Sequence, residues 1–349
     1  MKNRNVAIAA IIVVAIVVSS VVVLDSGLLG NKSGGLITYA ADAYTIEADY
    51  MLSGFHNSSG AQVEPVTSGG SYADAEEIAT GHPANVFISV ALNSYDRTYL
   101  GQRYSGWAIA FASDQIVLAY NQTAISGSSS QDKTAQTIIA EFASASPTNN
   151  TTQYRQAFAN LTSGGVKIGI SDPNEDPAGV RAYTSLEIAG YLFENNVSYY
   201  LHKIAEKNCN VTASNAAALV GSLDTGFIQF LYIYKSAAIS DGLSYIALPD
   251  YMNFGSENKS AFYGEFNYTI STGVVNGSPI YLYISALANN TDSSVANGFV
   301  TYVVKNSGNL SRFGLVPLTP ALLFSNVTLP GWLDNLQNQS VIVNEGGFT

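Results

Sequence analysis

Three acidic or hydroxyl side chains stand where an apolar run gives way to a helix-like pattern. Asp42 follows the apolar residues 36–40, Ser71 follows the glycines of TSGGS, and Asp176 precedes PAGV. Helix N-termini carry free backbone N–H groups and partial positive charge, so three converging ends would bind an anion without lysine or arginine. Taken singly, each residue is typical of ordinary capping: Ser71 and Asp74 have the spacing of a capping box, and Asp42 and Asp176 are in N-cap positions.

The loop over residues 171–179, SDPNEDPAG, joins an apolar run at 166–170 to a helical pattern that starts near Val180. Proline fixes φ and glycine tolerates positive φ, so the loop is predicted to be a tight turn. A strand, a tight loop and a helix N-terminus form the usual ligand position of α/β sheets. The negative charge of carboxylates at this position would repel an anionic ligand. We expect Asp42 to repel a dianion at neutral pH and to become a neutral donor below the ordinary aspartate pKa of about 3.9.

Composition and motifs exclude several functions. The chain has 15 Lys plus Arg, a formal net charge of −11 and no basic block, so nucleic acid is a poor partner. HxxH, CxxC, GxGxxG and P-loop patterns are absent, and Cys209 is the only cysteine, which rules out an intramolecular disulfide. We therefore expect no enzyme activity, no cofactor and no metal site of the protein's own.

The elements that must position these residues alternate along the chain. Apolar runs predict strands at LITYA, QVEPV, NVFISV, WAIAFA, QIVLAY, VKIGI, FLYIY, SYIAL and PIYLYISAL. Helical spacing falls between them at YADAEEIA, KTAQTIIAEFASA, SLEIAGYLF and SSVANGFVTYVVK. This alternation predicts an α/β fold with mostly parallel sheet. The polar stretch 121–134 is either a linker between lobes or a surface loop.

The first 35 residues predict a membrane segment and a tether. Residues 6–24 are apolar apart from Ser19 and Ser20, and they span roughly 28 Å as a helix, about one hydrocarbon core. Lys2 and Arg4 precede them, which places the N-terminus in the cytoplasm. No small-residue cleavage site follows closely, so an uncleaved anchor over 1–25 is favoured over a cleaved signal. Residues 26–35 are expected to form a short flexible tether, with the globular part outside the cell.

Glycosylation sequons of the N-x-[ST] type are spread over the chain and predict a heavily N-glycosylated exterior, although a chain merely rich in Asn, Ser and Thr would also contain them. The 15 asparagines that begin such sequons are Asn31, Asn57, Asn121, Asn149, Asn150, Asn160, Asn196, Asn210, Asn258, Asn267, Asn276, Asn289, Asn309, Asn326 and Asn338. Few charges and many possible glycans suit an acidic exterior.

Several stretches together resemble the archaeal tungstate/molybdate-binding proteins of ABC transporters, a branch of the periplasmic-type solute-binding proteins. The resemblance covers almost everything from Leu36 to about Trp332. It is carried by YSGWAIAFASDQIVLAY, VKIGISDPNEDPAGVRAY, FLYIYKSAAISDGLSYIALPD and VPLTP, in this order. It implies a two-lobe (type II) fold that closes on an oxyanion, and an ABC permease as partner. We expect lobe one to comprise 36–115 and 245–349, and lobe two 116–244, with QIVLAY and LYIYKS as the crossovers.

The resemblance also implies ligand-binding residues. The family's site serine corresponds to Ser71, its metal-reaching aspartate to Asp176 and its tyrosine to Tyr234, with backbone N–H groups near Ser71 and Ala178. Two positions depart from the family: Asp42 stands near its first serine, and Ala216 replaces its second carboxylate. A tungstate or molybdate ion would then be held as a tetrahedron, without added carboxylate coordination.

Two other functions are compatible with this sequence. The departures at Asp42 and Ala216 would suit a glycosylated, membrane-tethered surface protein that kept the fold but binds another ligand or none. Asp42 and Asp176 could also form the carboxylate pair of an enzyme, although no His, Cys or metal cluster supports it.

Overall fold

The computed structural model describes residues 34–290 and 293–348. The expected membrane segment over 6–24 lies outside these residues, as does the start of the tether. Within the described part of the chain, no helix is both long and apolar enough to cross a membrane.

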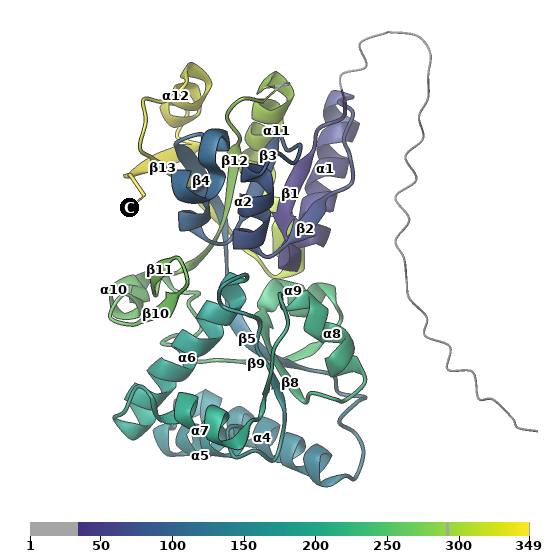
Figure 1. The fold of residues 1–349 in the computed structure, drawn as a ribbon, viewed down its shortest axis with the longest axis vertical. Helices are drawn as coiled ribbons and strands as arrows, with labels where there is room; N and C mark the ends of the chain where they lie inside the picture. The colour runs from purple at the N-terminus through teal and green to yellow at the C-terminus, as the bar shows by residue number, and fades with distance from the viewer. Residues whose placement is uncertain (1–33, 291–292, 349) are drawn as a thin grey trace, which may run out of the picture. The chain divides into compact units, whose positions relative to one another are not determined.

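The first lobe is built on a seven-stranded sheet with strand order β14-β13-β4-β12-β3-β1-β2. Its strands are β1 (Thr38–Ala41), β2 (Thr67–Gly69), β3 (Val86–Ser89), β4 (Trp107–Asp114), β12 (Ile280–Ala286), β13 (Val316–Ser325) and β14 (Ile342–Gly346). The α-helices of this lobe are α1 (Thr45–Ser59), α2 (Ser71–Ala79), α3 (Arg97–Leu100), α11 (Ser293–Asn306) and α12 (Gly331–Asn338). Figure 1 draws this lobe in its upper half.

The second lobe is built on a five-stranded sheet with strand order β7-β6-β8-β5-β9, in the lower half of Figure 1. Its strands are β5 (Ile116–Tyr120), β6 (Ile168–Gly169), β7 (Asn210–Val211), β8 (Phe230–Tyr234) and β9 (Ser244–Ala247). Its helices are α4 (Ser130–Ala145), α5 (Thr151–Leu161), α6 (Pro177–Glu194), α7 (Tyr199–Lys207), α8 (Ala217–Asp224) and α9 (Lys235–Ser240).

The remaining elements are short. A hairpin of β10 (Asn267–Ile270) and β11 (Gly273–Asn276) follows the one-turn helix α10 (Ser260–Tyr263), and Tyr268 of the hairpin stacks on Tyr183 of α6. The 3-10 segments are η1 (Asp42–Tyr44), η2 (Leu92–Tyr95), η3 (Gly101–Arg103), η4 (Ser146–Thr148), η5 (Glu257–Lys259) and η6 (Ser307–Phe313).

Local chemistry explains where the helices of lobe two start. Ser129 and Asp132 form a capping box at α4, in which each side chain accepts a hydrogen bond from the other residue's backbone N–H. The polar stretch 121–134 therefore contains the start of α4 and belongs to lobe two. Asp176 caps α6, and Pro177 occupies the first helical position, where a missing N–H costs nothing.

The sheets are mixed, so the expectation of a mostly parallel sheet was wrong. β1 runs parallel to β2 and β3, whereas β12 runs antiparallel to both β3 and β4. The chain leaves lobe one through β4 and returns through β12, and strands that leave and return run in opposite directions. The strand expected at 62–66 was also misplaced, because β2 starts at Thr67 and Val63 makes only an isolated bridge to Leu36.

A single residue, Gln115, separates β4 of the first sheet from β5 of the second. The buried carboxylate of Asp114 at this crossing accepts hydrogen bonds from the Tyr44 hydroxyl at 3.0 Å and the Ser236 hydroxyl at 2.5 Å. Tyr44 belongs to lobe one and Ser236 to lobe two, so this carboxylate ties both lobes to the crossing. Burial raises the pKa of Asp114 to about 6 despite these hydrogen bonds.

Candidate functional site

Asp176 lies at the N-terminus of α6 with only 2% of its surface exposed. One carboxyl oxygen, Oδ1, accepts the backbone N–H of Ala178 at 2.9 Å, and the other, Oδ2, accepts that of Ala216 at 3.0 Å. Burial raises the pKa of Asp176, whereas these hydrogen bonds and the Arg181 charge oppose the rise. Its position as N-cap agrees with the sequence prediction. Ala216, where the resemblance placed a lost carboxylate, contributes a backbone N–H instead.

Asp42 is half-buried and reaches from lobe one to lobe two. Its Oδ2 atom accepts the N–H of Ala217, the first residue of α8, at 3.3 Å. Burial and the neighbouring Asp176 raise the pKa of Asp42 to about 8. A pKa raised this far favours the neutral carboxyl at neutral pH, whereas the expectation of a charged Asp42 rested on the pKa of an exposed aspartate. It is also the first residue of η1, not an N-cap.

Ser71 is completely buried, and its Oγ atom accepts the backbone N–H of Val90 at 3.3 Å. The capping box expected for Ser71 and Asp74 does not form, because Ser71 is already the first helical residue and Gly70 is the N-cap. Gly70 lies against the other lobe. A Cβ atom at position 70 would be only 2.2 Å from the carbonyl oxygen of Glu175, so glycine is needed for this approach.

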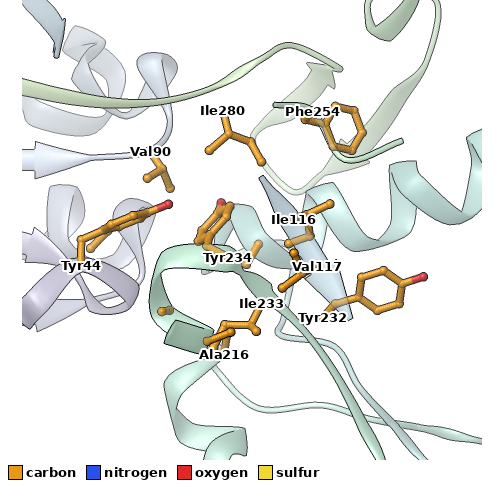
Figure 2. Packing of buried hydrophobic residues seen from close by; sticks show 14 of the residues in the cluster. Tyr44, Val90, Ile116, Val117, Ala216, Tyr232, Ile233, Tyr234, Phe254 and Ile280 are labelled. Carbon is orange, nitrogen blue, oxygen red and sulfur yellow. The ribbon is translucent and has the colours of Figure 1, made fainter. Parts of the chain in front are cut away.

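Tyr234 ends β8 in the buried space between the lobes. Its ring centroid lies 5.5 Å from that of Tyr44, and Figure 2 shows the Tyr44 hydroxyl directed toward the Tyr234 ring. The Tyr234 hydroxyl is buried and has no hydrogen-bond partner among the described residues. Burial raises the pKa of this phenol well above its usual value, so it stays protonated and able to donate.

Three residues around this site escaped the sequence reasoning, namely Tyr44, Asp114 and Arg181, and a fourth, Asp74, was considered only as a capping partner of Ser71. Asp74 is buried in α2, and its pKa is raised to about 8 by burial, with smaller effects from Asp42 and Glu77. Arg181 is 5% exposed, and its Nη2 atom donates to the Val90 carbonyl at 3.4 Å. Arg181 is the only charged residue in the first ten positions of α6, a signal that could have marked it as unusual.

The structure thus brings Asp42, Asp176 and Tyr234 to the region where the lobes meet, with Ala178 and Ala216 donating N–H groups to Asp176. Ser71 joins them through Val90, which contacts both Ser71 and Arg181. Ligand binding by these residues remains a prediction. The arrangement places backbone N–H groups, which here donate to Asp42 and Asp176, near the unpartnered hydroxyl of Tyr234. Within residues 34–290 and 293–348, no cluster of three or more His, Cys, Asp or Glu is suited to hold a metal ion.

The family model described as bacterial extracellular solute-binding protein matches residues 39–309, and the chain belongs to this family. It is a binding protein rather than an enzyme. An uncharacterized solute-binding protein from Saccharolobus solfataricus is 36% identical over 331 residues, covering 91% of this chain and 80% of the relative. A more distant relative from Thermococcus kodakarensis, named molybdate/tungstate-binding protein, is 25% identical over 253 residues and covers 64% of each chain.

Solved structures agree on the fold. The periplasmic molybdate-binding protein of Azotobacter vinelandii aligns with a TM-score of 0.53 at 16% identity, covering 80% of this chain and 98% of that one. The sulfate-binding protein SubI of Mycobacterium tuberculosis aligns with a TM-score of 0.53 at 12% identity, covering 89% and 94%. At such identities the likeness establishes the two-lobe periplasmic-binding-protein fold.

Proposed function

We propose that this chain captures tungstate or molybdate between its two lobes and delivers the ion to an ABC-transporter permease. The name of the relative from Thermococcus kodakarensis supports the choice of anion. The geometry supports an oxyanion more generally, because the donors between the lobes are backbone N–H groups at helix starts, which favour negatively charged oxygen.

One observation carries the proposal. Carboxyl oxygens of Asp42 and Asp176 already accept hydrogen bonds from N–H groups in the first turns of α8 and α6, at 3.3 Å from Ala217 and 2.9 Å from Ala178. Oxyanion oxygens accept hydrogen bonds from the same kind of donor. The buried, unpartnered hydroxyl of Tyr234 adds a donor beside them.

Two residues set how the ion would be held. Ala216 has no carboxylate to offer, so we expect four-coordinate, tetrahedral tungsten or molybdenum. Asp42 occupies the Ala217 N–H, so a bound oxyanion must displace its carboxyl or lie beside it in the protonated form. A protonated Asp42 adds no negative charge and can donate one hydrogen bond to the ion.

Isothermal titration calorimetry on the purified chain with tungstate, molybdate and sulfate tests the proposal. Ser71→Ala should weaken binding about tenfold, since one hydrogen bond to a charged ligand contributes roughly 1.5–3 kcal/mol. Ser128→Ala, at an exposed serine of lobe two, is the matched control and should bind as wild type does. A crystal soaked with tungstate would show the coordination number directly.

The alternative function is a membrane-tethered, glycosylated surface protein with another ligand or none. The carboxyl of Asp42 on the α8 N-terminus favours it, because that carboxyl competes with any anion. If wild type binds none of the three anions and Asp42→Ser restores no binding, the oxyanion proposal should be abandoned for this one.

A further inference from the structure

A cavity lies near the inter-lobe site, and the site residues do not line it. Its volume is about 400 Å³, within the roughly 300–1,000 Å³ typical of small-molecule sites. Most of its wall comes from lobe one and the β10–β11 hairpin, and Arg181 of α6 is the contribution of lobe two. Asp42, Ser71, Asp176 and Tyr234 do not line it. We name it the aromatic pocket, after Tyr72, Tyr281, Tyr283, Phe324 and Phe348 in its wall.

Arg181 gives this pocket a buried positive charge. The side chain is 5% exposed, and its Nε atom is buried without a hydrogen-bond partner among the described residues. No carboxylate in the described part of the chain forms an ion pair with it; the three pairs there involve Arg155, Lys203 and Lys207. A buried, incompletely paired guanidinium is costly, and its planar donors match a carboxylate.

Two glutamates give the same pocket a negative charge. Glu257 of η5 and Glu345 of β14 both line it, and each is exposed to solvent on its other side. They are close enough to repel each other, and Glu257 and Arg181 both act electrostatically on Tyr283. The pocket therefore combines a buried positive charge at Arg181 with an exposed negative pair, and Tyr283 lies within electrostatic reach of Arg181 and Glu257.

The aromatic rings supply the apolar surface that an organic ligand would cover. Tyr283 lies 6.1 Å from Tyr281 and 5.9 Å from Phe324, between ring centroids, with both pairs edge to face. A tetrahedral oxyanion would gain no favourable contact from aromatic walls. The volume of the cavity is also more than ten times the roughly 30 Å³ that one water fills.

We propose that the aromatic pocket binds a small organic zwitterion of the amino-acid or dipeptide class, with its carboxylate at Arg181, its ammonium at Glu257 and Glu345, and its apolar part against the tyrosines and phenylalanines. The cationic end faces the solvent-exposed glutamates and the anionic end faces inward. This site is separate from the proposed oxyanion site, so either can exist without the other.

The test compares ligands that differ in one charge. The full chain is titrated calorimetrically with L-phenylalanine and glycyl-L-phenylalanine, then with hydrocinnamate, which lacks the ammonium, and phenethylamine, which lacks the carboxylate. We expect at least one zwitterion to bind, and both single-charge analogues of phenylalanine to bind at least tenfold more weakly than that zwitterion. Failure of both zwitterions to bind, or equal binding of the analogues, overturns the proposal.

Variants locate the binding. The double variant Glu257→Gln/Glu345→Gln preserves side-chain size at exposed positions and should weaken zwitterion binding at least tenfold. Glu76→Gln, an exposed glutamate of α2 outside the pocket, is the control. Arg181→Met should abolish zwitterion binding, but its burial puts folding at risk, so the glutamate variant decides. An unchanged zwitterion affinity in that variant contradicts the proposal. Tungstate binding by the same variant tests the other site independently.

Discussion

The inter-lobe site and the aromatic pocket lie side by side, but buried groups of opposite charge type dominate them: carboxyls in the first and a guanidinium in the second. Between the lobes, the protein's own carboxyls occupy the backbone N–H groups, and burial raises the pKa of both Asp42 and Asp176. In the aromatic pocket, about 400 Å³ stands open beside a buried guanidinium with a free Nε. Arg181 borders both regions. It donates a hydrogen bond to the carbonyl of Val90, and the N–H of Val90 donates to the Oγ atom of Ser71.

This difference teaches how two sites with neighbouring residues can select unlike ligands. A site filled by its own acids admits an anion only through displacement or protonation, so pH and lobe closure govern it. A preformed pocket depends on shape and on fixed charges of both signs. Changes to closure, to protonation and to buried acids should therefore separate the two.

The largest effect is expected from Gly70→Ala. The backbone at Gly70, with φ −67° and ψ 141°, suits alanine, but the new methyl group would meet the Glu175 carbonyl oxygen of the other lobe. The lobes then cannot close fully, and tungstate or molybdate affinity should fall about 100-fold, or roughly 2.8 kcal/mol. Zwitterion binding should fall less, because lobe one supplies most of the aromatic pocket. Calorimetry measures both affinities.

Gly221→Ala in α8 is the control for that variant. No atom lies within 4 Å of a Cβ built there, so binding should not change. Equal losses at the two sites in Gly70→Ala would show that they are one site. Small-angle scattering should find a larger radius of gyration for Gly70→Ala in the presence of tungstate than for wild type.

The next effect concerns Asp42 and pH. Because the pKa of Asp42 is raised to about 8, it is mostly neutral at pH 7 and mostly ionised at pH 9. A dianion should therefore bind wild type about tenfold more weakly at pH 9, a difference of roughly 1.4 kcal/mol. Asp42→Ser should bind more tightly than wild type at both pH values, with the larger gain at pH 9. Titrations at pH 5, 7 and 9 measure this.

Zwitterion binding provides the contrast for Asp42, since Asp42 does not line the aromatic pocket. The affinity for the zwitterion should be the same in wild type and in Asp42→Ser at each pH. An oxyanion affinity in wild type that rises between pH 7 and 9 would contradict the assigned role of Asp42.

The smallest effect is expected on stability. Burial raises the pKa of Asp74 to about 8 and that of Glu47 to about 7, so the folded protein holds protons that the unfolded chain releases near pH 4. The folded state then binds more protons than the unfolded state between about pH 4 and 8, and stability falls as pH rises through this range. The decrease in Tm over this pH range should be smaller in Asp74→Asn than in wild type, by a few degrees.

Differential scanning calorimetry at pH 4, 6 and 8 on Asp74→Asn and on the control Asp49→Asn, at an exposed carboxylate of α1, measures the slope. A wild-type Tm that rises from pH 4 to 8 would contradict the assignment of buried, protonated acids. The result also bears on the expected acidic exterior, where such a protein would be near its most stable.

The sequence predicted what local chemistry determines. The pair Asp176–Pro177 marks the start of α6, because the cap and the fixed φ act within one turn. Continuous apolar runs located β3, β4, β5, β8 and β12, each largely buried on both faces. The two-lobe fold followed from the family resemblance rather than from these runs.

Contacts between distant residues could not be predicted in this way. The bond from Ala217 to Asp42 spans 175 residues, and the raised pKa of Asp42 depends on burial that only the assembled lobes create. Arg181 is the only charged residue early in α6, but the sequence alone does not show that the fold buries it. The mixed sheet follows from the return of β12 beside β4, which the order of strands along the chain does not reveal.

The Asp114 carboxylate has a mechanical consequence. It is held by Tyr44 from one lobe and Ser236 from the other, at the single residue step between β4 and β5. We expect this point to act as a hinge, so that the lobes rotate about it instead of sliding apart. Tyr44 and Tyr234, which lie next to the hinge, would keep their separation when Gly70 and Glu175 move apart. Distances between paired spin labels, one pair near the crossing and one near Gly70, would show unequal changes on adding tungstate, whereas equal changes would rule out the hinge.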